Sequence, residues 1–147
     1  MLTKSALVLR DLDVFTGRPA RIGITLTTLD ERLRELWEPG AASVQERLGV
    51  IEAARRVGLQ TGVMFGPLLP FLSDSQQAID ALLQRATDLK IDRIWVDAIN
   101  PRPRVWPAVA EIIFQVPPAR RDPMVSKGTR SGRASSLAYD VAAPLLS

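Results

Sequence analysis

The sequence of 147 residues contains no cysteine and no histidine. Without cysteine the chain forms no disulfide, offers no thiolate nucleophile and holds no iron–sulfur cluster by itself. Without histidine it lacks the usual zinc ligands, the Ser-His-Asp triad and the commonest general base near neutral pH. Chemistry here must rest on carboxylates, Lys and Arg, hydroxyl groups and the backbone, or on groups from elsewhere. These absences argue against an enzyme that works alone.

The sequence also lacks a signal-peptide pattern and any apolar run near the ~20 residues that span a bilayer. We therefore expect a cytoplasmic protein with no membrane partner. Acidic and basic side chains balance over residues 1–119, so the net charge of +3 arises in residues 120–147. That basic end is typical of a disordered tail, and contact with nucleic acid or acidic lipid is the alternative.

Short apolar runs alternate with amphipathic helical patterns over residues 1–116. The predicted strands are 2–3, 21–27, 59–65 and 93–99, and the predicted helices are 5–15, 28–38, 43–57, 74–89 and 106–115. The expected helix caps are Ser5, Thr28 with Glu31, Ser43 with Glu46, and Asp74. Such alternation predicts βαβ units with a parallel sheet, and hence the α/β class.

Four such units make about half of an eight-fold barrel. The expected fold is an incomplete parallel (β/α) barrel over residues 1–116, truncated at its N-terminus. Residues 117–147 are expected to form an irregular, disordered tail that contains Ser, Gly and Pro.

Functional groups of α/β proteins gather at the carboxyl ends of the strands. That rule selects Lys4, Ser5, Thr25, Thr27, Gly66 and Asp97. Each has a structural alternative: a solvated lysine, core threonines, a turn at Gly66, or an aspartate paired with an arginine. Glu38 and Arg47 are expected to form a structural ion pair nearby. No catalytic residue and no set of metal ligands follows from the pattern.

Several short motifs are specific in their amino-acid sequence and in their order along the chain. They are residues 3–13 (TKSALVLRDLD), 24–30 (ITLTTLD), 38–39 (EP) with 46–48 (ERL), and 62–70 (GVMFGPLLP). Together they resemble radical S-adenosylmethionine (SAM) proteins of the spore photoproduct lyase-like, or DNA repair photolyase, group. The resemblance covers about residues 2–115 and implies a partial (β/α)6 barrel. This chain would begin near the third strand of that barrel.

The resemblance implies an enzyme that binds SAM beside a [4Fe–4S] cluster and cleaves it reductively to a 5′-deoxyadenosyl radical. By similarity Lys4 would contact SAM, Thr25 would hydrogen-bond its ribose or carboxylate, and Gly66 would lie near its adenine or ribose. Ser5 and Thr27 are further candidates, and Asp97 occupies the region of the last SAM-contacting motif. The family's CxxxCxxC loop, which binds the cluster, and its SAM-binding Gly/Glu motif are absent.

The favoured interpretation is a fragment of a radical SAM enzyme, and we expect this chain to be inactive by itself. The namesake substrate of the family is a DNA lesion. Its expected partner is a missing N-terminal segment that bears the cluster, or a second copy joined through open sheet edges. The alternative is a non-catalytic α/β binding module whose basic tail contacts nucleic acid. An independent enzyme with Asp97 and Lys4 as acid and base is disfavoured, because no third group orients them.

Overall fold

The computed structural model describes residues 1–100 and 106–116, and the backbone of residues 137–139. The strands are β1 (Leu2–Thr3), β2 (Arg21–Leu26), β3 (Gln60–Leu68), β4 (Arg93–Ala98) and β5 (Leu137–Tyr139). The helices are the 3₁₀ helix η1 (Ala6–Asp11), then α1 (Leu12–Phe15), α2 (Glu31–Trp37), α3 (Val44–Arg56), α4 (Gln76–Asp88) and α5 (Trp106–Gln115). None of the helices in these described ranges is long and apolar enough to cross a membrane.

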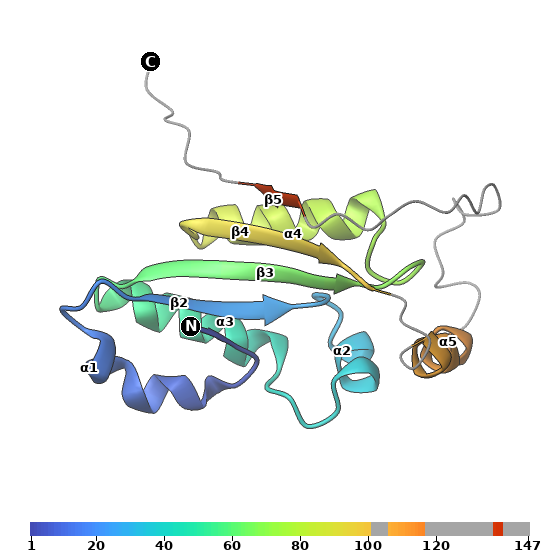
Figure 1. Cartoon of the computed structure of the whole chain (residues 1–147), viewed down its shortest axis with the longest axis horizontal. Coiled ribbons are helices and arrows are strands. Elements are labelled where there is room, and N and C mark those ends of the chain that lie inside the picture. Colours follow the sequence, from blue (N-terminus) through green and yellow to red (C-terminus); the bar gives the residue numbers. More distant parts are fainter. Residues whose placement is uncertain (101–105, 117–136, 140–147) are drawn as a thin grey trace, which may run out of the picture.

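The strands form one sheet in the order β1-β2-β3-β4-β5. Strands β1 to β4 are parallel to their neighbours, so the four predicted strands and the α/β class are confirmed. Strand β5 pairs antiparallel with β4 and lies in the segment for which the sequence pattern predicts no element. The described residues form an open sheet, and they show no closed barrel (Figure 1).

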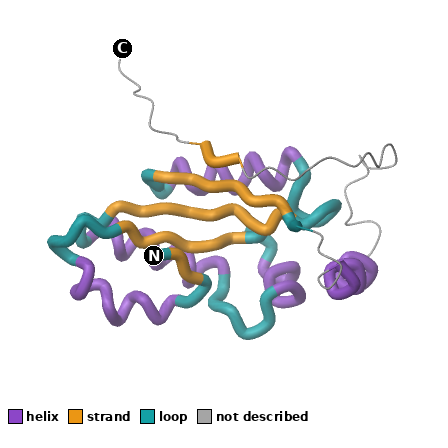
Figure 2. Tube along the Cα trace, in the orientation of Figure 1, coloured by secondary structure: helices purple, strands orange, loops and turns teal. Residues whose placement is uncertain are grey.

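Helices α3 and α4 lie on the same side of the sheet, as right-handed crossovers with an advancing strand order require (Figures 1 and 2). Alternate strand residues point toward them and form the core, among them Ile22, Ile24, Val63, Phe65 and Ile94. The residues between these point to the opposite side, because successive strand side chains alternate. We call that side the open face and define it by Leu2, Gly23, Thr25, Gly62, Met64, Gly66, Trp95 and Asp97.

The predicted N-cap of α3 is confirmed, whereas the predicted N-cap of α2 is wrong. Ser43 and Glu46 form the predicted capping box of α3, with Glu46 N donating to Ser43 Oγ and Ser43 N to Glu46 Oε2. Helix α2 is capped by Asp30 instead of Thr28, because Asp30 Oδ1 accepts from the backbone of the second and third helical residues. Thr28 Oγ1 instead accepts from Asp30 N, and so holds the turn that precedes the cap.

The predicted cap of α4 is also wrong. Ser75 caps this helix, with its Oγ accepting from Ala78 N at 3.1 Å. Asp74 Oδ1 accepts from Phe71 N at 2.8 Å and so stabilises the preceding turn. Ser5 does cap a helix, as predicted, through its Oγ and Leu7 N. The helix is 3₁₀ as far as Asp11, so residues 5–15 form two short pieces instead of one α-helix.

Strand β3 continues past Phe65 to Leu68, so the loop predicted at residues 66–70 begins later than expected. Gly66 therefore lies within the strand, where a cis peptide bond joins it to Pro67 and the register with β4 shifts. A Cβ on Gly66 would stand 2.7 Å from the Asp97 carbonyl oxygen and 3.0 Å from Asp97 Cβ. The absence of a side chain at Gly66 thus allows β3 and β4 to approach each other here.

We predict that Gly66→Ala destabilises the protein by about 1–3 kcal/mol, since its Cβ forces β3 and β4 apart. The matched control is Gly49→Ala in α3, where an added Cβ meets nothing within 4 Å. That change should stabilise the protein by about 0.5–1 kcal/mol, because alanine favours the helix. Urea unfolding of the three proteins measures both effects. Equal stability of the Gly66→Ala variant and the parent would refute the close approach.

Candidate functional site

A buried carboxylate, Glu38, connects two cations at the carboxyl end of the sheet. Glu38 follows the last residue of α2, and its side chain is only 6% exposed. Its Oε1 forms an ion pair with Lys4 Nζ, just after β1. Its Oε2 lies 2.6 Å from Nη2 of Arg47, in the first turns of α3. The ion pair predicted between Glu38 and Arg47 is therefore confirmed, and Lys4 extends it to three charges.

Arg47 is fully buried and fixes the carboxyl end of β2. Its Nη1 donates to the Thr25 carbonyl oxygen at 2.9 Å, and its Nε donates to the Ala42 carbonyl oxygen at 2.8 Å. Arg47 Nη2 and Glu38 Oε2 make no hydrogen bond of good geometry with any described residue, so the opposite charge of each compensates the other. A buried charge left without its partner is strongly destabilising, so both charges are needed together.

Thr27 joins this network to the neighbouring strand. Its hydroxyl lies 3.3 Å from Glu38 Oε1 and 3.2 Å from the Gly66 carbonyl oxygen. A hydroxyl has one proton, so Thr27 donates to one of these oxygens at a time. Its side chain is 2% exposed. Its hydroxyl therefore serves contacts within the protein, between β2, β3 and the end of α2.

The surroundings of Glu38 keep it ionised. Burial alone would raise the pKa of the Glu38 carboxyl group, but the contacts of Lys4 and Arg47 outweigh burial and hold the pKa below its ordinary value. The three charges sum to one net positive charge at the carboxyl end of β1 and β2. This excess favours an anionic group nearby.

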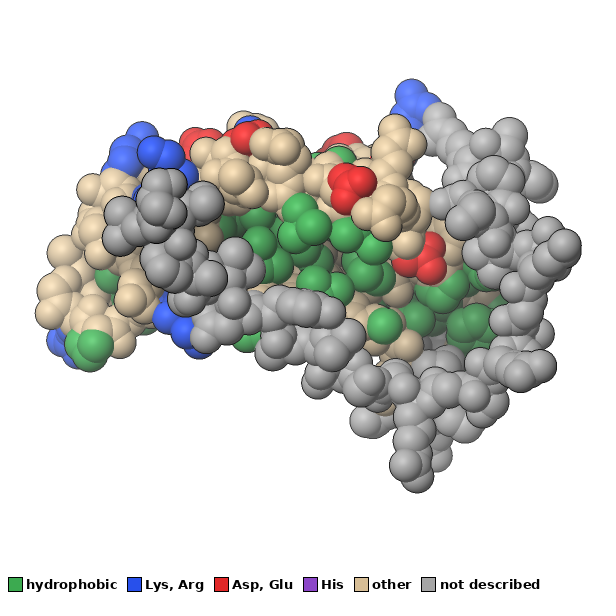
Figure 3. All heavy atoms as spheres, turned by 90° about the horizontal axis from the view of Figure 1, so that it is seen from above, with side chains coloured by type: hydrophobic (Ala, Val, Ile, Leu, Met, Phe, Trp, Pro, Cys, Tyr) green, Lys and Arg blue, Asp and Glu red, His purple; other side chains and the backbone are tan. Residues whose placement is uncertain are grey.

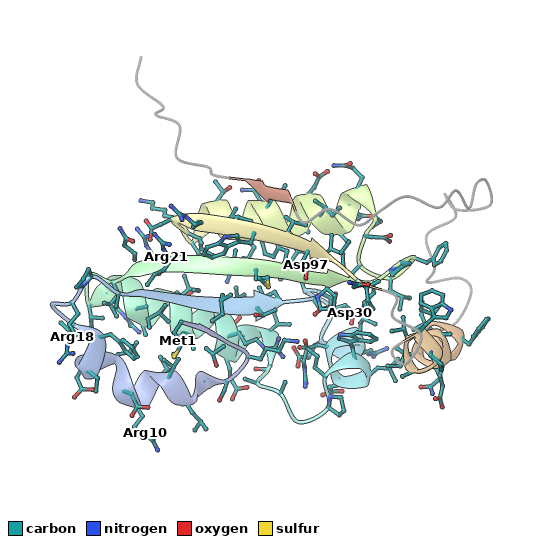
Figure 4. The ribbon with its side chains drawn as sticks, in the orientation of Figure 1. Met1, Arg10, Arg18, Arg21, Asp30 and Asp97 are labelled. Carbon is teal, nitrogen blue, oxygen red and sulfur yellow. The ribbon has the colours of Figure 1, made fainter. Side chains whose placement is uncertain are left out.

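Three predicted site residues present polar groups that the described protein leaves available. The Lys4 side chain is 42% exposed, and Glu38 is its one partner among the described residues. Thr25 is buried, at 9% exposure, but its hydroxyl has no hydrogen-bond partner among those residues, and the strand alternation directs it to the open face. Asp97 is exposed on β4, at the carboxyl end of the same face (Figure 4). The structure thus brings a cation, a hydroxyl and a carboxylate to one edge.

The other three predicted site residues have structural roles in the described chain. Ser5 caps η1, Thr27 bridges two strands, and Gly66 admits the backbone of β4. The register relates two of the six residues to each other, Lys4 and Thr25. Thr3 pairs with Ile24, which places Lys4 at the level of Thr25, and Thr25 pairs with Met64 of β3.

The chain itself supplies no thiolate or imidazole, because it has no cysteine or histidine. Over residues 1–100 and 106–116, no three acidic side chains gather in a way that could hold a metal ion. The groups at the carboxyl edge suit an organic ligand with charged and hydroxyl groups better than a metal.

No protein-family model matches the sequence. An uncharacterized protein of Acidianus two-tailed virus is 27% identical over 105 residues, 68% of this chain and 35% of that protein. An uncharacterized Mycobacterium tuberculosis protein is 37% identical over 87 residues, 56% of this chain and 26% of that protein. One from Methanocaldococcus jannaschii is 30% identical over 80 residues, 54% of this chain and 31% of that protein. The chain thus spans about a quarter to a third of these relatives.

Among solved structures, coproporphyrinogen III oxidase of Escherichia coli, described as a radical SAM enzyme, matches 80% of this chain and 25% of its own. The TM-score is 0.55 and the sequence identity 16%, so this likeness concerns the fold alone. A spore photoproduct lyase matches 95% of this chain and 42% of its own at 16% identity, with a TM-score of 0.49. That score is too low to establish a shared fold. The chain therefore shares its fold with part of coproporphyrinogen III oxidase.

We predict that Glu38→Gln lowers stability near neutral pH by about 3–5 kcal/mol, because it leaves the buried Arg47 without a counter-charge. A lowered folded-state pKa means that the stabilisation by Glu38 is complete above its ordinary pKa and is lost as the pH falls through the lowered value. The difference in the free energy of unfolding between parent and variant should therefore become smaller below about pH 4. Urea unfolding at several pH values measures it.

The control is Glu35→Gln. Glu35 lies 3.3 Å from Arg34 and is 67% exposed, so its ion pair is worth about 1 kcal/mol at most. A Glu38→Gln variant that unfolds like this control would show that the buried network does not stabilise the fold.

Proposed function

We propose that this chain forms the SAM-contacting part of a radical SAM enzyme of the spore photoproduct lyase-like group. The fold of coproporphyrinogen III oxidase supports the wider class. What supports the proposal is the position of Lys4, Thr25 and Asp97 at the carboxyl ends of β1, β2 and β4 in one sheet. The substrate class that the sequence resemblance suggests is damaged nucleic acid.

The polar groups at this edge fit SAM. Lys4 has N–H groups beyond the one that contacts Glu38, and an ammonium group suits the carboxylate of SAM. The hydroxyl of Thr25 suits a ribose hydroxyl or a carboxylate oxygen. Asp97 is an acceptor for hydroxyl groups or a counter-charge for the cationic end of SAM. Gly66 has no side chain to obstruct a ligand beside these groups. Its carbonyl oxygen already accepts a hydrogen bond from the Thr27 hydroxyl.

The [4Fe–4S] cluster does not fit the residues of this chain. Such clusters are held by cysteine thiolates, and the sequence has none. SAM bound beside a reduced cluster supplies a carbon radical for hydrogen abstraction, but the cluster and its electron must come from outside these 147 residues. We therefore assign to this chain the binding and orientation of SAM, and no chemical step.

Within this proposal, the Lys4–Glu38–Arg47 network positions the ligand-binding groups. Arg47 holds the Thr25 backbone, and Glu38 holds the Lys4 amine near that level of the sheet. The network thereby limits where the Lys4 ammonium group can move. A fixed cation loses less conformational entropy when it binds an anion.

The alternative function, a binding module that uses a basic tail, depends on residues 117–147. Apart from the backbone of β5, these lie outside the described residues, so no observation favours it. The expected second copy, joined through sheet edges, and a chain that bears the cluster both remain predictions.

We predict that the chain binds SAM and that Lys4→Gln weakens this binding about tenfold or more, since a charge-assisted hydrogen bond is worth about 1.5–3 kcal/mol. Isothermal titration calorimetry with SAM measures the affinity. The matched control is Arg10→Gln, which removes one positive charge from an exposed position on η1 (Figure 4). The control should bind like the parent. Equal losses in both variants, or no binding by the folded parent, would overturn the assignment of Lys4.

A further inference from the structure

A hollow lies on the open face, at the end of the strands opposite the proposed SAM site. It has a volume of about 290 Å³ and is lined by Met1, Leu2, Arg21, Gly23 and Trp95. Arg21 begins β2, whereas Asp97 lies near the end of β4, so the hollow and the proposed SAM site occupy different ends of the sheet (Figure 4).

Two paired glycines lie beneath the side chains that line this hollow. Gly23 and Gly62 are paired in the register of β2 and β3. A Cβ on Gly62 would stand 2.6 Å from Cζ3 of Trp95 and 3.4 Å from Cδ of Arg21. The indole ring and the arginine stem therefore both lie against the backbone of β3. A Cβ on Gly23 would stand 2.6 Å from Leu2 Cδ2, so that side chain also lies directly on the sheet.

The arginine at this hollow has unused hydrogen-bonding capacity. Among the described residues its one side-chain hydrogen bond runs from Nη2 to Gln60 Oε1, at 2.8 Å. Its Nε is buried and makes no hydrogen bond within the described residues. A guanidinium group carries five N–H donors and prefers carboxylate or phosphate oxygens. The nearby Asp92 carboxylate accepts hydrogen bonds from Thr61 N and Oγ1, and its negative charge also attracts Arg55 and Arg21.

Further basic side chains lie at the same end of the molecule as the hollow. Lys and Arg side chains gather at the left end of the molecule in Figure 3, the end at which β2, β3 and β4 begin. Acidic side chains lie beside this basic group in the same view, as well as over the middle and the right. The hollow thus combines an aromatic ring, apolar side chains and the Arg21 cation.

We propose that this hollow binds a small planar aromatic anion of about mononucleotide size. The ring of such a ligand would lie against the Trp95 indole, and its phosphate or carboxylate would accept hydrogen bonds from Arg21. Stacking of a base on an aromatic side chain is a common source of affinity that tolerates any base. The volume lies near the lower limit for small-molecule sites, which excludes larger ligands from the hollow itself.

The test uses uridine 5′-monophosphate (UMP) as probe, with the full chain in solution. Its binding is followed through the indole N–H signal of Trp95 in ¹H–¹⁵N NMR spectra, which Trp95→Phe identifies by its loss. We expect a saturable shift of that signal with UMP, a much smaller one with uridine at equal concentration, and none with inorganic phosphate. Equal affinity for uridine and UMP would overturn the anionic part of the proposal, and a shift with phosphate alone would overturn the aromatic part.

Two arginine variants locate the anion contact. Arg21→Gln should weaken UMP binding tenfold or more, whereas Arg21→Lys, which keeps the charge, should lose less. The dispersion of the remaining NMR signals reports whether each variant is folded. Lys4→Gln is the control at the other end of the face and should bind UMP like the parent. Loss of UMP binding in Lys4→Gln with retention in Arg21→Gln would overturn the proposal and place UMP in the SAM site.

Discussion

The buried ion pair between Glu38 and Arg47 is the interaction on which the carboxyl end of this sheet depends. Arg47 holds the backbone of β2 and of the loop before α3, while Glu38 brings the end of α2 against them. Both side chains are almost wholly buried, so neither charge is solvated when the other is absent. Lys4 then takes its position from Glu38. The positions of Lys4 and Arg47 at this edge therefore depend on one carboxylate.

Much of this arrangement could be predicted from sequence because it depends on local spacing. Alternating strands and helices indicated the parallel sheet, and the Ser43–Glu46 box fixed the start of α3. The caps failed where several short polar residues stand together. Thr28 and Asp30, and likewise Asp74 and Ser75, are all able to cap, and the choice falls to the residue directly before the helix. The packing of the preceding turn decides which residue stands directly before the helix.

The features that could not be predicted depend on the register between strands. The approach of β4 to Gly66 and the contact of Trp95 with Gly62 are set by partners 31 to 33 residues apart, which a pattern within one strand does not contain. The same holds for the hollow beside Arg21, whose lining comes from β1, β2 and β4. Period-two alternation identifies which residues share a face, but the neighbours across the face follow only from pairing.

The two ends of the open face differ in chemistry because they differ in what lies beneath them. At the carboxyl end the polar groups rest on buried charges, so that edge suits a ligand with charges of its own. At the amino end an indole ring and an arginine side chain line the hollow, which suits a flat ring with a negative charge. Met64 lies between the two ends and pairs with Thr25 on one side and Trp95 on the other. Each end has its own cation, Lys4 or Arg21. An anion bound at one end therefore leaves the cation at the other end free to bind a second anion.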